Sequence, residues 1–251
     1  MSNLLTKRPA LLRPASVLAC LSVLALAGCG NESDGSSDSA KDSSSASSSA
    51  SSSESAGASG STGKTVTCDY PTDGQDPARD VDAPDEQAPA EGTVTATMTT
   101  NFGDITLTLD RADAPCTVNS FVSLAEQGFY DDTPCPRIGD QEGFGILQCG
   151  DPTGTGAGGA GYSFPDELSG DETYPAGTLA MANAGPDTNG SQFFLVFRDS
   201  QFPPSYTTFG TIDEAGLKVI DAIAKEGNDG ANPAGGGAPN KDVTIEKVTI
   251  A

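Results

Sequence analysis

Hydrophobic and polar residues alternate through residues 93–110, which predicts two β-strands joined by a tight turn. Apolar side chains occupy every second position from Val94 to Met98 and again from Ile105 to Leu109. A period of two places each set on one face of a pleated strand. The four residues between the runs, Asn-Phe-Gly-Asp, are typical of a turn between two strands.

Two segments instead repeat hydrophobic residues every three or four positions, as amphipathic helices do. The first covers residues 117–127 and is followed by Gly128, and the second covers residues 214–226 and is followed by Gly227. Glycine directly after such a segment is typical of a helix C-terminus.

Short apolar runs elsewhere predict further strands. They lie around Arg137, at 146–148, at 193–197, around Thr208 and at 243–248. Many short strands with only two helices favour a mainly β fold, a closed antiparallel barrel capped at its ends.

The start of the chain has the features of an export signal. Lys7, Arg8 and Arg13 form a basic region without any acidic residue, and an apolar stretch follows at 15–27. About 20 apolar residues are needed to span a bilayer, so this shorter stretch predicts a secretory signal. It ends in Leu-Ala-Gly-Cys at Cys29, which resembles the lipobox of bacterial lipoproteins. The alternative is an ordinary signal peptide with a chance cysteine.

The lipobox predicts a chain of four parts. Residues 1–28 are a lipoprotein signal peptide, and Cys29 carries acyl chains that anchor the protein stably to a membrane. Residues 29–63 are a disordered tether, since serine makes up 16 of its last 34 residues and such a segment cannot bury enough apolar surface to fold. Residues 64–92 form an acidic, proline-rich and irregular lead-in, and residues 93–251 form the folded domain.

Four cysteines remain in the exported chain, Cys68, Cys116, Cys135 and Cys149. Outside the reducing cytosol they favour two disulfides, in any of three pairings. A four-cysteine zinc site is the alternative, but no two of them are spaced as CxxC. Cys68 is the only evident anchor of the lead-in, so we expect it to take part in a disulfide.

Charge and composition exclude several classes of function. The formal net charge is −22, and such an acidic surface repels nucleic acid and anionic lipid. Calcium or a basic client would suit this charge, although solubility alone accounts for it. The chain has no histidine, which excludes a Ser-His-Asp triad, a Cys-His pair and histidine metal ligands. A GxGxxG pattern at 154–159 is not followed by a helical segment, so we predict no dinucleotide site there. We also predict no metal and no other cofactor.

Two long motifs carry the functional signal. Residues 148–156 read QCGDPTGTG and residues 179–197 read LAMANAGPDTNGSQFFLVF, with an isolated Arg137 before them. In sequence, order and separation they resemble the motifs of the cyclophilins, a family of peptidyl-prolyl cis-trans isomerases. The resemblance covers residues 93–251. It implies a closed eight-stranded antiparallel barrel capped by two helices, with the substrate site on its outer face.

The resemblance also implies roles for individual residues. Arg137 matches the catalytic arginine, whose hydrogen bond reaches the prolyl nitrogen as the peptide bond twists, and Gln148 matches the glutamine that orients it. Asn183 matches an asparagine whose main chain binds the residue before proline. The implied substrate-binding residues are Phe144, Ile146, Ala182, Asn183, Gln192, Phe194, Phe202 and Tyr206.

The chain departs from the family's pattern in the segment that follows Arg137. Cys-Pro precedes this arginine where the family has Phe-His, and the segment up to Gln148 is longer. Gly145 stands where the family has a pocket phenylalanine, with Phe144 beside it, and the chain has no tryptophan. These departures favour an alternative of another class, a chaperone or scaffold that grips proline-containing segments without useful turnover.

We therefore predict a monomeric prolyl isomerase that acts on Xaa-Pro segments of exported polypeptides. It would lie at the outer face of the cell membrane, anchored through Cys29, and would bind no nucleic acid. A lipid-anchored solute-binding protein is a third class, which neither the length nor the motifs support.

Overall fold

The computed structural model describes residues 63–251. The predicted signal peptide, the predicted lipidation site Cys29 and all but the last residue of the predicted tether lie outside the described residues. Within residues 63–251, no helix is long and apolar enough to cross a bilayer.

The described part of the chain contains eleven strands and two helices. In chain order these are β1 (Thr65–Thr67), β2 (Gln87–Pro89), β3 (Thr93–Thr100), β4 (Gly103–Asp110), α1 (Pro115–Glu126), β5 (Thr133–Pro134), β6 (Arg137–Gln141), β7 (Phe144–Cys149), β8 (Thr178–Met181), β9 (Phe193–Arg198), β10 (Thr208–Ile212), α2 (Glu214–Lys225) and β11 (Thr244–Ile250).

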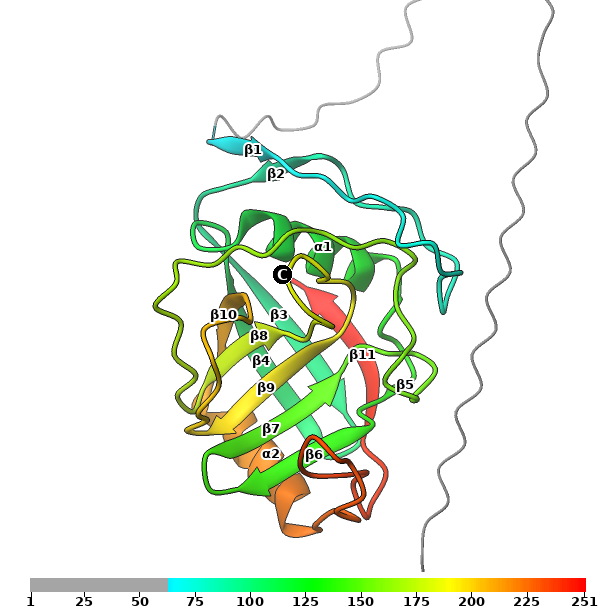
Figure 1. Cartoon of the computed structure of the whole chain (residues 1–251), viewed down its shortest axis with the longest axis vertical. Coiled ribbons are helices and arrows are strands. Elements are labelled where there is room, and N and C mark those ends of the chain that lie inside the picture. The colour runs from blue at the N-terminus through cyan, green and yellow to red at the C-terminus, as the bar shows by residue number, and fades with distance from the viewer. Residues whose placement is uncertain (1–62) are drawn as a thin grey trace, which may run out of the picture. The chain divides into compact units, whose positions relative to one another are not determined.

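Nine of these strands form one antiparallel sheet in the order β5-β11-β3-β4-β10-β8-β9-β7-β6. The sheet curls over on itself (Figure 1). Strands β3, β4, β7 and β9 all contribute side chains to the hydrophobic core. Helix α1 packs against β11, and helix α2 packs against β4.

The mainly β fold with two helices is confirmed, but the prediction of a closed eight-stranded barrel is wrong. The sheet has nine strands and forms a half-barrel, because its edge strands β5 and β6 do not pair with each other. Strand β5 has two residues, and only Cys135 and Pro136 separate it from β6. Proline lacks the N–H that a continuous ladder needs. The chain therefore leaves β11 at this point and pairs with β7 instead.

The predicted hairpin at 93–110 is confirmed as β3 and β4. Val94 lies opposite Leu109 and Met98 opposite Ile105, and all four side chains are buried. Burying an apolar side chain of this size contributes about 1.5–3 kcal/mol. A slip of one residue would turn the whole set toward water, so the alternation fixes the register of this hairpin.

The two predicted helices are also present, and each begins at a polar cap. Asp213 precedes α2 and accepts a hydrogen bond from the Gly216 N–H at 2.7 Å. Helix α1 begins at Pro115, where a missing N–H costs nothing. Its next two N–H groups, of Cys116 and Thr117, donate to the Glu167 carboxylate at 3.0 and 2.8 Å. The cap of α1 thus comes from about 50 residues further along the chain.

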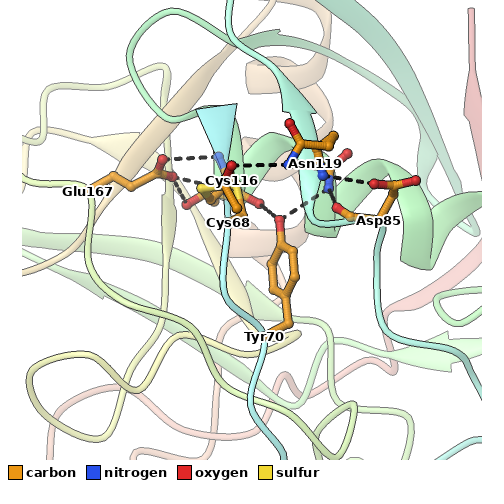
Figure 2. The surroundings of a disulfide bond; sticks show 9 residues. Cys68, Tyr70, Asp85, Cys116, Asn119 and Glu167 are labelled. Atoms are coloured by element: carbon orange, nitrogen blue, oxygen red, sulfur yellow. Dashed lines mark hydrogen bonds between the residues drawn. A yellow bond between two sulfur atoms is a disulfide. The ribbon is translucent and has the colours of Figure 1, made fainter. Parts of the chain in front are cut away.

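The lead-in has two short strands and otherwise no regular secondary structure, but it is tied to α1. Strands β1 and β2 pair with each other beside α1 (Figure 1). Cys68 forms a disulfide with Cys116 at the start of α1, and the Tyr70 hydroxyl donates to the Cys116 carbonyl at 2.8 Å (Figure 2). At the other end of the helix, Arg79 donates to the Gly128 carbonyl at 3.1 Å. The lead-in is therefore fastened along the whole length of α1.

A second disulfide joins Cys135 to Cys149. Cys135 lies just before β6, and Cys149 ends β7. These two strands carry Arg137 and Gln148, so the disulfide locks the base of the hairpin that presents both residues.

Candidate active site

Three neighbouring strands bring the predicted catalytic residues into one row. Arg137 on β6 lies opposite Gln148 on β7, and Gln148 lies opposite Phe194 on β9. Directly opposed residues share one face of a sheet. The adjacent row, which includes Ile138 and Leu147, belongs to the core. Side chains alternate between faces along a strand, so the row of Arg137 faces outward.

A second hydrophobic cluster covers this outer face, separate from the core. It surrounds a cavity of about 380 Å³, which we call the aromatic pocket. Its apolar walls are Phe144, Ile146, Phe194, Phe202 and Tyr206, and its polar rim includes Arg137, Gln148, Asn183 and Gln201.

The rings of the aromatic pocket hold one another edge to face. Phe194 contacts Phe202 and Tyr206 with ring centroids 5.8 and 5.4 Å apart. Such pairs add about 0.5–1.5 kcal/mol beyond the area that they bury. Phe194 is itself only 4% exposed, so it forms the floor of the pocket, and its neighbours form the walls.

Arg137 is held at the rim by three hydrogen bonds. Its Nη1 donates to Gln148 Oε1 at 3.2 Å, its Nε to the Gly235 carbonyl at 3.0 Å, and its Nη2 to the Ala234 carbonyl at 2.8 Å. The guanidinium also lies 5.0 Å from the centre of the Phe144 ring. A guanidinium has five N–H donors, so two remain for a ligand in the pocket.

The surroundings of Arg137 favour a strong hydrogen bond to a ligand. Partial burial lowers the pKa of this guanidinium, and the nearby Tyr206 opposes that shift. An arginine nevertheless stays protonated at physiological pH. Because fewer water molecules surround the charge, its interaction with a ligand dipole is stronger than in bulk water.

Gln192 fixes the orientation of the Gln148 side-chain amide, which Arg137 contacts. Gln148 Nε2 donates to Gln192 Oε1 at 2.9 Å. Gln192 Nε2 in turn donates to the carbonyls of Gly156 and Gly158, both at 3.0 Å. Because the amide nitrogen of Gln148 is bound to Gln192, its amide oxygen is directed toward Arg137. The glycine-rich segment 154–159 therefore supports the arginine through two side chains.

Ala182 and Asn183, both within the sequence motif at 179–197, also line the aromatic pocket. The Asn183 side chain donates to the Ser205 carbonyl at 2.8 Å and accepts from the Gly185 N–H at 3.3 Å. Within the described part of the chain, the main-chain N–H and C=O of Asn183 make no backbone hydrogen bond. They are available to the backbone of an extended peptide, which is a common mode of peptide recognition.

Comparison with known proteins identifies this arrangement. The family described as "Cyclophilin type peptidyl-prolyl cis-trans isomerase/CLD" matches residues 95–250. The chain belongs to this family. The predictions of a cyclophilin and of a peptidyl-prolyl isomerase are confirmed.

Individual relatives agree with this assignment. A probable peptidyl-prolyl cis-trans isomerase B of Mycobacterium leprae is 47% identical over 204 residues, which cover 76% of this chain and 68% of that relative. The corresponding protein of Mycobacterium tuberculosis is 50% identical over 62% of this chain but only 54% of its own length. A cyclophilin-type isomerase of Cryptosporidium parvum, solved in the presence of the dipeptide Ala-Pro, matches with a TM-score of 0.54 and 31% identity over 62% of this chain and 98% of that one.

The loop that departs from the cyclophilin pattern still supplies an aromatic ring. Phe144 lies in the aromatic pocket, 5.5 Å from the Phe202 ring centre. A Cβ at Gly139 would come within 2.0 Å of the Phe144 ring, and a Cβ at Gly145 would come within 2.5 Å of Arg198 Cβ. The absence of a side chain at Gly139 thus makes room for the ring of Phe144, while Arg198 leaves no space for a side chain at position 145.

Sequence reasoning missed several residues that build the site. Tyr174 lies beneath the pocket, where it contacts Phe194 and Phe202, and its hydroxyl donates to the Tyr206 carbonyl at 3.1 Å. The carbonyls of Ala234 and Gly235 were missed as partners of Arg137. No periodicity or motif surrounds these positions, so the sequence offers no signal for them. Among residues 63–251, no group of three or more cysteine or acidic side chains is placed to hold a metal ion.

Proposed function

We propose that this cyclophilin catalyses cis-trans isomerisation of Xaa-Pro bonds in exported polypeptides, at the outer face of the membrane to which Cys29 anchors it. The observation that carries the catalytic part is the placement of Arg137. A fixed guanidinium with two unused donors borders an aromatic pocket of about 380 Å³.

The chemistry requires no bond to break. Rotation about a peptide bond has a barrier of about 18–20 kcal/mol, because the C–N bond loses its double-bond character on the way. At the twisted transition state the prolyl nitrogen becomes pyramidal and accepts a hydrogen bond, which a planar amide nitrogen does poorly. A donor fixed at that nitrogen stabilises the transition state more than the ground state. Arg137 is the donor we assign to this role.

The other residues hold the substrate while the bond turns. Phe194, Phe202 and Tyr206 enclose the proline ring, and the main chain of Asn183 holds the residue before it. Gln148 positions Arg137, and Gln192 positions Gln148. None of these roles moves a proton, which agrees with a chain that has no histidine. The Ala-Pro dipeptide used with the Cryptosporidium parvum cyclophilin supports the same substrate class for this chain.

Export and anchoring rest on the sequence of the N-terminal segment. A basic start, a short apolar stretch and Leu-Ala-Gly-Cys at Cys29 precede a serine-rich tether. The sequence predicts a disordered tether there, and a coil of that length would span about 30 Å and would hold the domain close to the membrane surface. The two disulfides support this location, because disulfides persist mainly in oxidising compartments.

A second candidate function is a scaffold that binds proline-containing segments without useful turnover. The observation that favours it is the crowding around Arg137. The Phe144 ring lies beside the guanidinium, and the carbonyls of Ala234 and Gly235 already occupy two of its donors. A scaffold would still bind Xaa-Pro peptides in the aromatic pocket but would not accelerate their isomerisation.

The deciding experiment is an NMR exchange assay with full-length protein and an Ala-Ala-Pro-Phe peptide. Catalysis adds exchange between the cis and trans signals of the peptide, whereas a scaffold only shifts those signals. The location is tested separately by fractionating cells that express the wild type or Cys29→Ala. We expect the wild type in membranes and the variant either released or unprocessed. Wild-type protein found entirely in the soluble fraction would contradict the anchor.

A further inference from the structure

A second cavity adjoins the aromatic pocket. It has a volume of about 610 Å³, and Gln148, Ala182 and Asn183 border both cavities. We call it the polar cavity, because glycine, serine and threonine residues make up much of its wall. A peptide with its proline in the aromatic pocket therefore passes Asn183 and reaches the polar cavity directly.

The polar cavity has one charged side chain in its wall, Asp73. This residue belongs to the lead-in and lies upstream of residues 95–250, which the family matches. Neither of the ion pairs formed among residues 63–251 involves Asp73. One carboxylate oxygen accepts a hydrogen bond from the Gln75 N–H at 2.8 Å, and the other faces no hydrogen-bond donor within that part of the chain. The cavity thus has an uncompensated negative charge.

Asp73 is held in place by the backbone around it. Its N–H donates to the Gly161 carbonyl at 3.2 Å, and the Ser163 N–H donates to the Pro71 carbonyl at 3.0 Å. Further along the lead-in, the Ala78 N–H donates to the Gly159 carbonyl at 2.8 Å. The lead-in therefore lies as an extra strip against the loop that closes the polar cavity. The disulfide at Cys68 fastens the start of that strip.

We propose that Asp73 makes this isomerase selective for substrates with a lysine or arginine upstream of the Xaa-Pro bond. The inference rests on the proposed function, because Asn183 is assigned there to the residue that precedes proline. The next residues toward the peptide N-terminus then lie over the polar cavity, two or three positions before proline. A cationic side chain at one of these positions meets the carboxylate of Asp73, and an acidic side chain is repelled by it.

The expected effect is moderate, because Asp73 is exposed. Exposed ion pairs change equilibria by about 1.5- to 5-fold, and salt weakens them. We therefore expect kcat/KM to favour lysine over glutamate by about two- to fivefold at low ionic strength, and less at high ionic strength.

The test uses full-length protein and two peptides, Ala-Lys-Ala-Pro-Phe and Ala-Glu-Ala-Pro-Phe. NMR gives both kcat/KM, from exchange, and Kd, from titration, so that no protease with its own charge preference takes part. Asp73→Asn keeps the oxygen that accepts from Gln75 but removes the charge, and it should bring the lysine-to-glutamate ratio close to one. Asp73→Lys should reverse the ratio.

Asp76→Asn is the matched control. Asp76 lies three residues away in the same exposed lead-in, but it does not line the polar cavity. This variant changes the net charge by the same amount, and it should keep the wild-type ratio. An equal loss of selectivity in both variants would assign the preference to the overall acidity of the protein and would overturn the inference. An unchanged ratio in Asp73→Asn would overturn it as well.

The two measurements separate this inference from the proposed function. If the peptides turn over but Asp73→Asn has no effect on the ratio of kcat/KM, the inference fails and the isomerase stands. If neither peptide turns over, the isomerase fails, and the ratio of the two Kd values still shows whether Asp73 selects the upstream charge.

Discussion

The aromatic pocket and the polar cavity adjoin each other but are built by different means. Strands β6, β7 and β9 supply the catalytic row of the aromatic pocket, since their register places Arg137, Gln148 and Phe194 side by side. The loop at 199–207 adds the walls Phe202 and Tyr206. Loops form the polar cavity, with a wall from the glycine-rich segment 156–159 and a single charge from the lead-in. The first has apolar walls and a cation at its rim, and the second has polar walls and a carboxylate.

This difference indicates that the aromatic pocket serves catalysis and that the polar cavity serves the choice of substrate. Hydrogen-bonded strands hold a guanidinium precisely enough to favour one transition state, since small displacements of a catalytic group are costly. A loop wall tolerates substitution and insertion better, so it is suited to the choice among substrates. Variants in the aromatic pocket should therefore change catalysis, and variants around the polar cavity should change selectivity or stability.

The largest expected effect is that of Arg137→Ala. Removing a donor that acts only in the transition state lowers kcat/KM by about 10²–10³. The residue lies on a rim, so the melting temperature should stay close to that of the wild type. Arg137→Lys should remain impaired, because an ammonium does not reproduce the planar fork that contacts Gln148 and the 234–235 carbonyls. Isomerase assays beside thermal unfolding measure both quantities.

The matched control for this variant is Arg111→Ala, an arginine at the end of β4 that does not line the aromatic pocket. Its activity should equal that of the wild type. Normal turnover by Arg137→Ala would remove the basis for catalysis at this rim, and the scaffold function would then be preferred.

The next largest effect is on stability, in Phe194→Ala. This change removes a ring that is only 4% exposed, and truncating a buried phenylalanine costs about 3–5 kcal/mol of unfolding free energy. Phe202→Ala, in which a half-buried ring is removed, should raise KM with a smaller loss of stability. Urea unfolding and peptide titration distinguish the two variants. Equal loss of stability in both would show that Phe194 is not the floor of the pocket.

Removing one disulfide should mainly lower the stability of the protein, and removing the other should mainly lower its activity. Cys68–Cys116 spans 48 residues and Cys135–Cys149 spans 14, so chain entropy assigns them about 4 and about 3 kcal/mol. We expect the opposite order for turnover of an uncharged Xaa-Pro peptide. Replacing Cys135 and Cys149 by serine loosens the hairpin of Arg137 and should lower kcat/KM more than replacing Cys68 and Cys116. A greater loss of turnover in the second variant would place the lead-in in the catalytic machinery.

The smallest expected effect is that of pH. A change in pH should alter the free energy of unfolding but not the rate of turnover. Burial acts to raise the pKa of Asp151, but hydrogen bonds from Thr153, Gly156 and Gly158 outweigh it and lower the pKa below its ordinary value. An unfolded aspartate has a pKa of about 3.9. The stabilisation is therefore present above about pH 4 and is lost as the pH falls through the lower native value.

Unfolding at pH 7 and at several pH values below about 4 measures this effect. Asp151→Asn should make the stability fall less steeply in that acid range. Turnover should be nearly constant between about pH 6 and 9, because the chain has no histidine to titrate in that range. A bell-shaped profile of kcat/KM would instead implicate a proton transfer that our mechanism does not contain.

The fold was predictable where it follows from local periodicity. A period of two gave β3 and β4, and a period near 3.6 gave α1 and α2, because each pattern buries one face of a regular element. Most of the site was predictable as well, because the motifs at 148–156 and 179–197 retain the family's order and spacing. Phe144 and Tyr206 lie outside both motifs, and the structure places both in the aromatic pocket as the resemblance implied.

The sequence by itself therefore determined the family, the two helices, the main hairpin and the choice of Arg137, Gln148 and Phe194 as candidate site residues. Tertiary structure alone decided how the sheet ends, with β5 and β6 unpaired to each other, and which cysteines join. It also brought Glu167 to the start of α1, the 234–235 carbonyls to Arg137, and Asp73 to the polar cavity. The physical reason is that periodicity records only whether a side chain faces the core. Contacts between residues 50 to 100 positions apart depend on how whole elements pack, and no local pattern encodes that.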